Sequence, residues 1–511
     1  MHTNRIYTRR VVLPMLIGLL SLSLINCSNA TKATTTHFKK KPNFTIEVNY
    51  QQAQPGDTLF LYVLNPIYPY PHVNDKRHRV FTAIAHQGSF TFKVPAQKAY
   101  GYFTIMKSRT FTDRGQSQPI MPLIENQFWE QGDSVQIAIS HKETAGGIYG
   151  SWKFYGKGSE KYKIRDHVFS MVHHQEVSSP GDYDENFDRT VNGGIKKKRL
   201  AYLENKKSAI SKAAYESLKA DIIYGYSSEF VNLQQYFKNH ITTASAAVRE
   251  EFVTRYTKFS NESLRVKGEG MSTELLANNP TYLRYLSRKY LADAVVMNAS
   301  YDQKWIYYRI KMTTTGLLRE REVVLLFLNP GRTKDTNSII KDAKHYVKDA
   351  YCLRFLQNIQ DKGTGTLITD ATFYDRDGKA VHISDFKGKV VLLDFWFNGC
   401  GACIGVYKEL TSKLHMIFKN EPDVVILAIN TDRSKQRWLS GIKLGKYTDD
   451  TAKNVYTNGM GFEHPFIKEN QIPTCPWLIL VDRKGVIRSV DGKELFELET
   501  LQEAIHALVK E

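Results

Sequence analysis

Two cysteines separated by two small residues follow directly on a long apolar run. Residues 390–403 read VVLLDFWFNGCGAC, which places Cys400 and Cys403 three positions apart. A continuous apolar run bounded by turn residues predicts a buried strand. Residues three apart in the first turn of a helix lie on one face, so the two sulfurs can meet if a helix begins at Cys400. The segment therefore indicates a strand, a turn and a helix, the building unit of an α/β sheet.

The spacing of the pair leaves three interpretations open. A disulfide exchanger needs a stabilised thiolate and a second thiol nearby, and the start of a helix would stabilise the thiolate of Cys400. A structural zinc site needs about four ligands, yet the sequence has no second C-x-x-C and no nearby H-x-x-x-H. Two inert cysteines could also pack in a core as small apolar residues. The redox interpretation fits best, and no metal or other cofactor is expected.

The N-terminus predicts export. Arg5, Arg9 and Arg10 precede the apolar stretch 11–25, which is too short to span a bilayer and typical of a signal peptide. The stretch ends at LINC, which resembles a bacterial lipobox with Asn26 in place of the usual small residue, so Cys27 is the predicted lipidation site. We therefore expect a signal peptide over 1–27, a tether over 28–42 and a protein on the periplasmic face of a bacterial membrane, anchored by lipid. Simple signal cleavage without lipid attachment is the alternative.

The rest of the chain divides into three parts by periodicity. Residues 43–150 alternate apolar and polar residues in short runs separated by Pro-Gly-Asp and Gln-Gly-Asp turns, which predicts an antiparallel β-sandwich. Residues 151–360 carry apolar residues at helical spacing and predict a mostly helical domain. Residues 366–511 alternate strands with helices. The fold class is thus a multidomain chain in which an all-β sandwich and a helical domain precede an α/β domain.

The net charge is unevenly distributed along the chain. The formal net charge is +18, but residues 366–511 hold 19 Lys+Arg and 20 Asp+Glu, so the excess lies upstream. A basic surface can bind polyanions, and such binding would collapse with salt. No nucleic-acid motif accompanies the charge, so we expect a solvated surface and no nucleic-acid partner.

The C-terminal motifs together resemble a known family. In order, GKAVHISDFKGK, VVLLDFWFNGCGACIGVYKEL and IPTCPWLILVDRKGVI are similar to TlpA/ResA-like thiol–disulfide oxidoreductases of the thioredoxin superfamily. The resemblance implies a thioredoxin-like fold over 366–511. It also implies Cys400 as the attacking cysteine, Cys403 as the resolving one and Asp394 as the acceptor of the Cys403 proton. Pro476 matches the superfamily's cis-proline.

Several positions are accessory or depart from that family. Trp396 matches a common aromatic position and is at least as well explained as a core residue, and Cys475 would place a third thiol near the pair. Gly399 and Ala402 replace the tryptophan and proline often found there, and Lys408 stands where a proline usually kinks the helix. Neither the redox potential nor the substrate can therefore be transferred from better-known members.

The sequence thus predicts an exported enzyme that exchanges disulfides with protein substrates, expected to act as a reductase. Such an enzyme needs electrons from across the membrane, so a membrane thiol-electron transporter is a predicted partner. The main alternative is a binding or scaffold lipoprotein with a vestigial redox site. A peroxidase on the same fold would need a Pro-x-x-x-Thr/Ser-x-x-Cys loop, and residues 395–399 supply neither the proline nor the hydroxyl.

Overall fold

The computed structural model describes residues 43–511, apart from 69–76, 109–119, 145–146, 172–193, 226–227, 266–269, 299–300, 329–332, 334, 451, 471 and 473. The predicted signal peptide, the tether and Cys27 lie outside the described residues. Within the described part of the chain, no helix combines the length and the apolar character that a membrane span requires.

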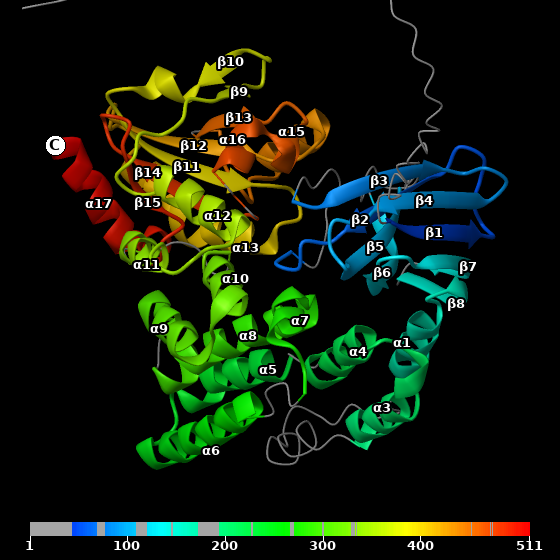
Figure 1. Ribbon diagram of the computed structural model, residues 1–511. Helices are drawn as coiled ribbons and strands as arrows, with labels where there is room; N and C mark the ends of the chain where they lie inside the picture. The colour runs from blue at the N-terminus through cyan, green and yellow to red at the C-terminus, as the bar shows by residue number, and fades with distance from the viewer. Residues whose placement is uncertain are drawn as a thin grey trace, which may run out of the picture. The chain divides into compact units, whose positions relative to one another are not determined.

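The N-terminal domain is a β-sandwich of two four-stranded sheets, ordered β4-β1-β7-β8 and β3-β2-β5-β6 (Figure 1). Its strands are β1 (Asn43–Tyr50), β2 (Thr58–Val63), β3 (Arg79–Ile84), β4 (Ser89–Pro95), β5 (Tyr100–Ser108), β6 (Ile120–Glu130), β7 (Ser134–Thr144) and β8 (Gly147–Lys157). The alternation read from the sequence appears directly in burial: Phe44, Ile46 and Val48 of β1 point into the core, and their neighbours do not.

The prediction of a purely antiparallel sandwich is wrong for one strand pair. β1 pairs antiparallel with β4 but parallel with β7. Parallel neighbours need a long crossover, and the five strands between β1 and β7 supply it: β4 pairs with β1, and the other four build the second sheet. In addition, β8 continues to Lys157, so the boundary placed at residue 150 falls inside a strand.

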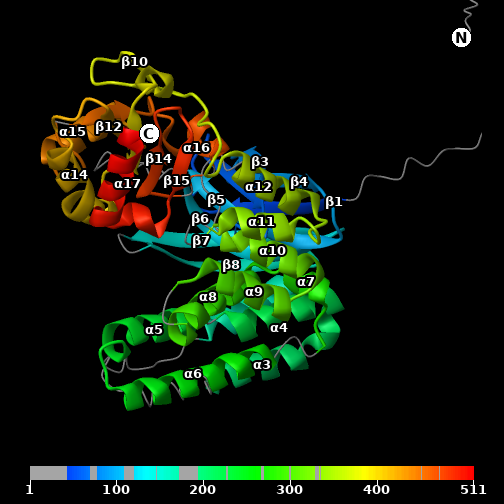
Figure 2. The same cartoon turned by 90° about the vertical axis from the view of Figure 1, so that its left-hand side faces the viewer.

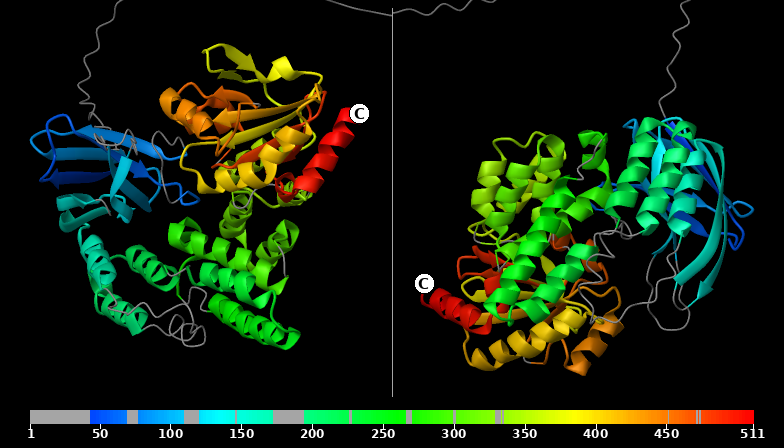
Figure 3. Two further views of the ribbon diagram at one scale, coloured as in Figure 1. Left: turned by 180° about the vertical axis from the view of Figure 1, so that it is seen from behind. Right: turned by 90° about the horizontal axis from the view of Figure 1, so that it is seen from below.

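The middle of the chain is helical, as its periodicity predicts. Its helices are α1 (Glu160–Ser170), α3 (Gly194–Asn205), α4 (Lys212–Tyr224), α5 (Ser228–Tyr236), α6 (Ala246–Arg265), α7 (Thr273–Asn278), α8 (Pro280–Met297), α9 (Gln303–Thr313), α10 (Gly316–Leu326), α11 (Thr336–Ala343) and α12 (Ala350–Asp361). Several begin at side-chain caps: Ser211, Asn279 and Asp302 each accept a hydrogen bond from a backbone N–H of the following turn. Figure 3 shows these green helices without strands among them.

The C-terminal domain is built on a seven-stranded sheet ordered β10-β9-β13-β12-β11-β14-β15. Its elements are β9 (Thr372–Tyr374), β10 (Ala380–His382), β11 (Val390–Trp396), α13 (Gly401–Val406), α14 (Ser412–Ile417), β12 (Val424–Asn430), α15 (Lys435–Leu444), β13 (Lys453–Tyr456), α16 (Pro465–Glu469), β14 (Trp477–Val481), β15 (Ile487–Val490) and α17 (Leu498–Lys510). The central strand β11 pairs parallel with β12 and antiparallel with β14.

Strand β11 is buried on both faces, as its apolar sequence, interrupted only by Asp394, predicts. Val390 and Leu392 pack in one apolar cluster with residues of α14 and α17, whereas Leu393 and Phe395 pack in another with residues of α15 and α16. Figure 2 shows α14 and α17 lying together on their side of the sheet. Helices on both faces hold β11 rigidly, so whatever follows its carboxyl end is well positioned.

Candidate active site

The loop after β11 carries the chain from the sheet to α13. The carbonyl of Trp396, the last residue of β11, accepts a 2.9 Å hydrogen bond from the backbone N–H of Thr431. Gly399, next to the first cysteine, has φ +96°, a backbone conformation that residues other than glycine rarely adopt. The turn requires a positive φ at this position, which explains why Gly399 stands there instead of the tryptophan that the resemblance implies.

Cys400 and Cys403 form a disulfide, with their Cα atoms 5.2 Å apart. Cys400 is the N-cap of α13, and its Sγ accepts a 3.0 Å hydrogen bond from the backbone N–H of Cys403. That N–H belongs to the unsatisfied first turn of the helix, so it would also stabilise a thiolate at Cys400 after reduction. Both cysteines are only 6% and 4% exposed in this oxidised state. The neighbouring Gly401 and Ala402 are exposed, so the surface in front of the pair is made of small residues.

Asp394 lies on β11 behind this turn and is buried, with 5% of its surface exposed. Burial raises the pKa of its carboxyl to about 7, and the smaller contribution of Thr411 lowers it. Among the described residues, no hydrogen bond links the carboxyl to either sulfur of the disulfide. The group is therefore poised to exchange a proton near neutral pH, and its transfer partner remains the predicted one, Cys403.

The segment before β14 brings Cys475 and Pro476 beside the pair. Cys400 Sγ lies 3.6 Å from the backbone carbonyl oxygen of Cys475, and the Cys475–Pro476 peptide bond is cis. The thiol of Cys475 is buried, and its Sγ lies 3.8 Å from the hydroxyl of Thr431. Burial raises the pKa of this thiol, so it stays protonated at neutral pH and is a poor nucleophile. The backbone of residue 475, rather than its sulfur, is what the structure places against Cys400.

Trp396 is a core residue in this structure, with 1% of its surface exposed. Its ring stacks on Tyr447 with 5.2 Å between centroids and 10° between planes. The hydroxyl of Tyr447 accepts a 2.9 Å hydrogen bond from the backbone N–H of Gly399. The aromatic pair therefore stabilises the turn through the hydrogen bond between Tyr447 and Gly399. Trp396 itself is buried and offers no surface to a substrate.

A polar network that sequence reasoning missed fixes the same turn from the side. Asn398 donates two 3.0 Å hydrogen bonds to Asp432 Oδ2, one from its backbone N–H and one from its side chain. Arg437 donates a 2.9 Å hydrogen bond to the Asn398 carbonyl and pairs with Asp432 at 3.3 Å. A Cβ on Gly441 would lie 2.5 Å from the side chain of Asn398, so the network also needs that glycine. The sequence feature that could have predicted this network is Asn430-Thr431-Asp432 at the end of β12. The carboxyl ends of adjacent parallel strands meet at one sheet edge, so this segment had to lie near Asn398.

The remaining candidate groups lie elsewhere. Cys352 on α12 is fully buried in the helical core, and burial raises the pKa of its thiol. Across the described ranges, no group of three or more His, Cys, Asp or Glu side chains is arranged to hold a metal ion. The site is thus a disulfide with one buried carboxyl behind it and a backbone carbonyl beside it.

Comparison with known proteins identifies the domain that carries this site. The Redoxin family model matches residues 363–497. The C-terminal domain is a Redoxin domain. Together with the sheet order around β11, the match confirms the thioredoxin-like fold predicted for 366–511, and the protein carries an oxidoreductase domain of the thioredoxin type.

Solved structures from Bacteroides species are similar to the same part of the chain. One is the thioredoxin domain of a thiol-disulfide oxidoreductase from Bacteroides vulgatus, with 29% identity, 28% of this chain and 97% of that chain covered, and a TM-score of 0.24. Another is a thiol:disulfide interchange protein from Bacteroides sp., with 28% identity, coverage of 29% and 91%, and a TM-score of 0.25. A thiol-disulfide oxidoreductase from Bacteroides fragilis matches at 22% identity, with coverage of 28% and 99% and a TM-score of 0.25. With TM-scores this low, the fold assignment rests on the sheet order and the Redoxin match.

Proposed function

We propose that the protein exchanges disulfides with protein substrates through Cys400 and Cys403, as a reductase exported to the periplasmic side of a bacterial membrane. The observation that carries the proposal is the disulfide at the junction of β11 and α13, with the Cys403 N–H directed at Cys400 Sγ. The Redoxin match supports redox chemistry, and the thiol-disulfide oxidoreductases similar to this domain support the substrate class. No bound cofactor is required.

The reaction starts from the reduced pair. The Cys400 thiolate attacks one sulfur of a substrate disulfide; that S–S bond breaks, a mixed disulfide forms, and the other substrate sulfur leaves as a thiolate that takes up a proton. Cys403 then gives its proton to Asp394 and attacks Cys400 Sγ. The mixed disulfide breaks, the second substrate thiol is released, and the Cys400–Cys403 disulfide remains. Two electrons have moved from the enzyme to the substrate, so a thiol donor must reduce the pair again, for which we propose a membrane thiol-electron transporter.

Insulin reduction tests the activity. The purified mature protein, kept reduced by dithiothreitol, should accelerate the precipitation of the insulin B chain, and Cys400→Ser should abolish the acceleration. Cys352→Ala removes a cysteine far from the pair and should leave the rate unchanged. Equal rates for the Cys400→Ser variant and the unaltered protein would contradict the proposal and favour the scaffold alternative. Faster consumption of hydrogen peroxide than of insulin disulfide would instead favour a peroxidase.

The direction of electron flow has its own test. The reduction potential of the pair can be measured against glutathione or dithiothreitol buffers. Thioredoxin, a reductant, has a potential of about −270 mV, and the oxidant DsbA one of about −120 mV. A value near the first supports a reductase, and a value near the second contradicts it.

Anchoring is proposed from the N-terminal sequence alone. A lipid on Cys27 predicts that the protein sediments with membranes after cell lysis, and that Cys27→Ser releases it into the soluble fraction. A protein that stays soluble without the substitution would contradict the anchor and favour simple signal cleavage.

A further inference from the structure

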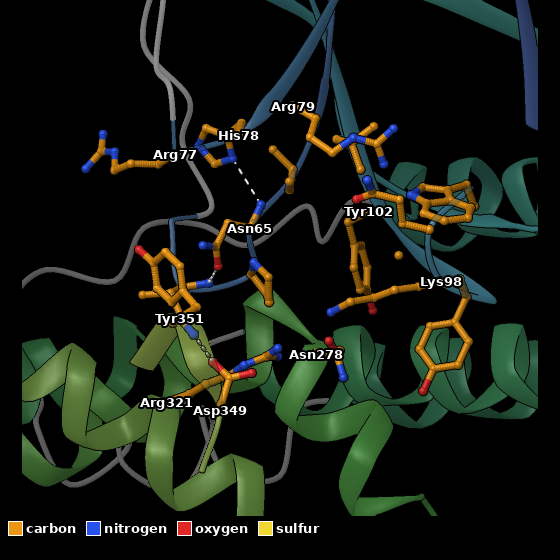
Figure 4. Close-up of a pocket in the computed structure, with 18 residues that line it drawn as sticks. Asn65, Arg77, His78, Arg79, Lys98, Tyr102, Asn278, Arg321, Asp349 and Tyr351 are labelled. Carbon is orange, nitrogen blue, oxygen red and sulfur yellow. Dashed lines mark hydrogen bonds between the residues drawn. The ribbon is translucent and has the colours of Figure 1, made fainter. Parts of the chain in front are cut away.

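A cavity of about 300 Å³ lies between the sandwich and the helical domain, away from the cysteine pair (Figure 4). Its walls come from the β2–β3 region and β5 on one side and from α7, α10 and the start of α12 on the other. Buried hydrogen bonds tie these walls together. Tyr102 Oη lies 2.7 Å from Ser217 Oγ and accepts a 2.7 Å hydrogen bond from the side chain of Asn279. The cavity is therefore bounded by two domains that are held to each other.

Positive charge dominates the lining of this cavity. The side chains of Arg77, Arg79, Lys98 and Arg321 border it, and Asp349 is the single carboxylate in the lining. One oxygen of that carboxylate is already engaged, because it caps α12 by accepting hydrogen bonds of 3.1 and 3.0 Å from the backbone N–H groups of the next residues. The cavity thus carries more positive charge than its own acid can balance.

Two of the cations, Lys98 and Arg321, converge on the cavity beside Asp349, whose negative charge acts on both. Arg321 is 5% exposed and donates a hydrogen bond to the carbonyl of Ala277. Lys98 forms no ion pair with any residue the structure describes, and Figure 4 shows its side chain reaching across the cavity. Burial and then the positive charge of Arg321 lower the pKa of Lys98. Lys98 is exposed and Arg321 is buried, and the one carboxylate in the lining balances only one of the two charges, so a ligand anion can neutralise the other.

The apolar part of the lining offers a second, independent sign of a ligand. Trp129 is 2% exposed and lines the cavity, and its indole N–H has no hydrogen-bond acceptor among the described residues. A buried donor without an acceptor is costly, and a ligand can remove that cost. Tyr100, Tyr351 and Ile67 add aromatic and aliphatic surface to the same cavity. Apolar and aromatic surface beside convergent polar groups is typical of small-molecule sites.

We propose that this cavity binds a small organic anion. Arg321 and Lys98 hold its carboxylate or phosphate group, the aromatic walls cover its apolar part, and the Trp129 N–H donates to one of its acceptor atoms. Arg provides a planar fork for either anionic group and Lys a point charge, so the two can act on one head group. The site does not depend on the redox chemistry of the C-terminal domain, and it gives the front part of the chain a function of its own.

Calorimetry on the purified mature protein tests the proposal with three probes: inorganic phosphate, phenyl phosphate and benzoate, at low ionic strength. At least one of the two aromatic anions should bind with one-to-one stoichiometry and more tightly than inorganic phosphate. If phenyl phosphate binds more tightly than benzoate, the ligand's head group is a phosphate. If benzoate binds more tightly, the head group is a carboxylate. Lys98→Gln should weaken binding on the order of tenfold, the usual effect of losing a charge-assisted hydrogen bond.

Lys93→Gln is the matched control, because Lys93 is exposed on β4, lies outside the cavity and changes the net charge equally. It should bind the probe as the unaltered protein does. Trp129→Phe keeps the apolar wall and removes the N–H donor, and it should also weaken binding. Three results would overturn the proposal: no saturable binding of either aromatic anion at millimolar concentration, binding of inorganic phosphate alone, or equal affinities in the Lys98→Gln and Lys93→Gln variants.

Discussion

The sulfur of Cys400 lies 3.6 Å from the backbone carbonyl oxygen of Cys475, although 75 residues separate them in the chain. Thr474 is exposed and Cys475 is buried, so the chain enters the core at the point where it passes the redox pair. The residues that follow Cys400, Gly401 and Ala402, are small and exposed. A disulfide that reaches Cys400 would therefore meet backbone and small side chains, and we expect this to suit substrates of varied sequence.

The stability of the protein should depend on pH through Asp394. Burial raises the pKa of this carboxyl to about 7 in the folded state, whereas the unfolded chain releases the proton near pH 4. Between these values the folded state binds the extra proton, so the free energy of unfolding falls as pH rises from about 4 to about 7, by up to roughly 4 kcal/mol. Asp394→Asn should remove this fall and be the more stable protein at pH 8. Urea unfolding across this pH range measures it.

Glu503→Gln is the control for that experiment, because Glu503 is an exposed carboxyl on α17. It should retain the pH dependence of the unaltered protein. In single-turnover reduction of a peptide disulfide, Asp394→Asn should also slow resolution of the mixed disulfide by roughly 10² and lose the pH dependence near 7. A variant with an unchanged pH–rate profile would show that Asp394 takes no proton from Cys403.

Substitution of Gly399 should destabilise the protein more than substitution of Gly405. Gly399 has φ +96°, whereas Gly405 lies in α13, where an added Cβ would meet no atom within 4 Å. Gly399→Ala should destabilise the protein by about 1–3 kcal/mol through backbone strain, and Gly405→Ala should be neutral or stabilising by up to about 1 kcal/mol. Denaturant midpoints of the two variants measure the difference. Equal midpoints would mean that the turn does not require positive φ.

The side chain of Asn398 should stabilise the turn that carries Cys400. Asn398→Ala removes a hydrogen bond to Asp432 and one to the carbonyl of Arg437, although both acceptors keep other donors. We expect a loss of about 1–3 kcal/mol in the free energy of unfolding and slower insulin reduction. Asn420→Ala, at an exposed position after α14, should change neither. A fully stable and active Asn398→Ala variant would contradict the role of the network.

The four cysteines of the described chain should differ in reactivity. After reduction, Cys400 should be alkylated first, because a helix N–H stabilises its thiolate. Cys352 and Cys475 should react only after unfolding, because burial raises the pKa of both thiols. Mass spectrometry of peptides after timed iodoacetamide treatment distinguishes the sites. Rapid labelling of Cys475 in the folded protein would restore it as an accessory thiol.

Local features of this molecule could be predicted from its sequence. The apolar run 390–396 is a buried strand, Cys400 caps the next helix, and period-two alternation at Phe44–Val48 marks a half-buried strand. Each depends on neighbouring residues whose side-chain directions follow from backbone period. The order of a sandwich, a helical domain and an α/β domain followed for the same reason.

Non-local pairings could not be predicted in this way. The parallel partner of β1 is β7, more than 80 residues away, and no local pattern distinguishes it from an antiparallel one. The network of Asn398, Asp432 and Arg437 needs three segments that meet only in the folded sheet. The helix after the cysteines also contains a π-helical turn, Tyr407–Thr411, which includes Lys408, the position where the family resemblance implies a proline. The sequence predicted a helix after Cys400 but not this turn, because an inserted residue leaves little trace in an apolar pattern.

A redox titration of Cys400 and Cys403 tests the central claim most directly. The protein is equilibrated in buffers of defined dithiothreitol potential, quenched with iodoacetamide, and the peptide carrying both cysteines is weighed by mass spectrometry. The account predicts one reversible two-electron transition, in which both cysteines change together at a potential near that of thioredoxin, about −270 mV. Cysteines that are alkylated independently at every potential, or a disulfide that no potential in the range reduces, would contradict it.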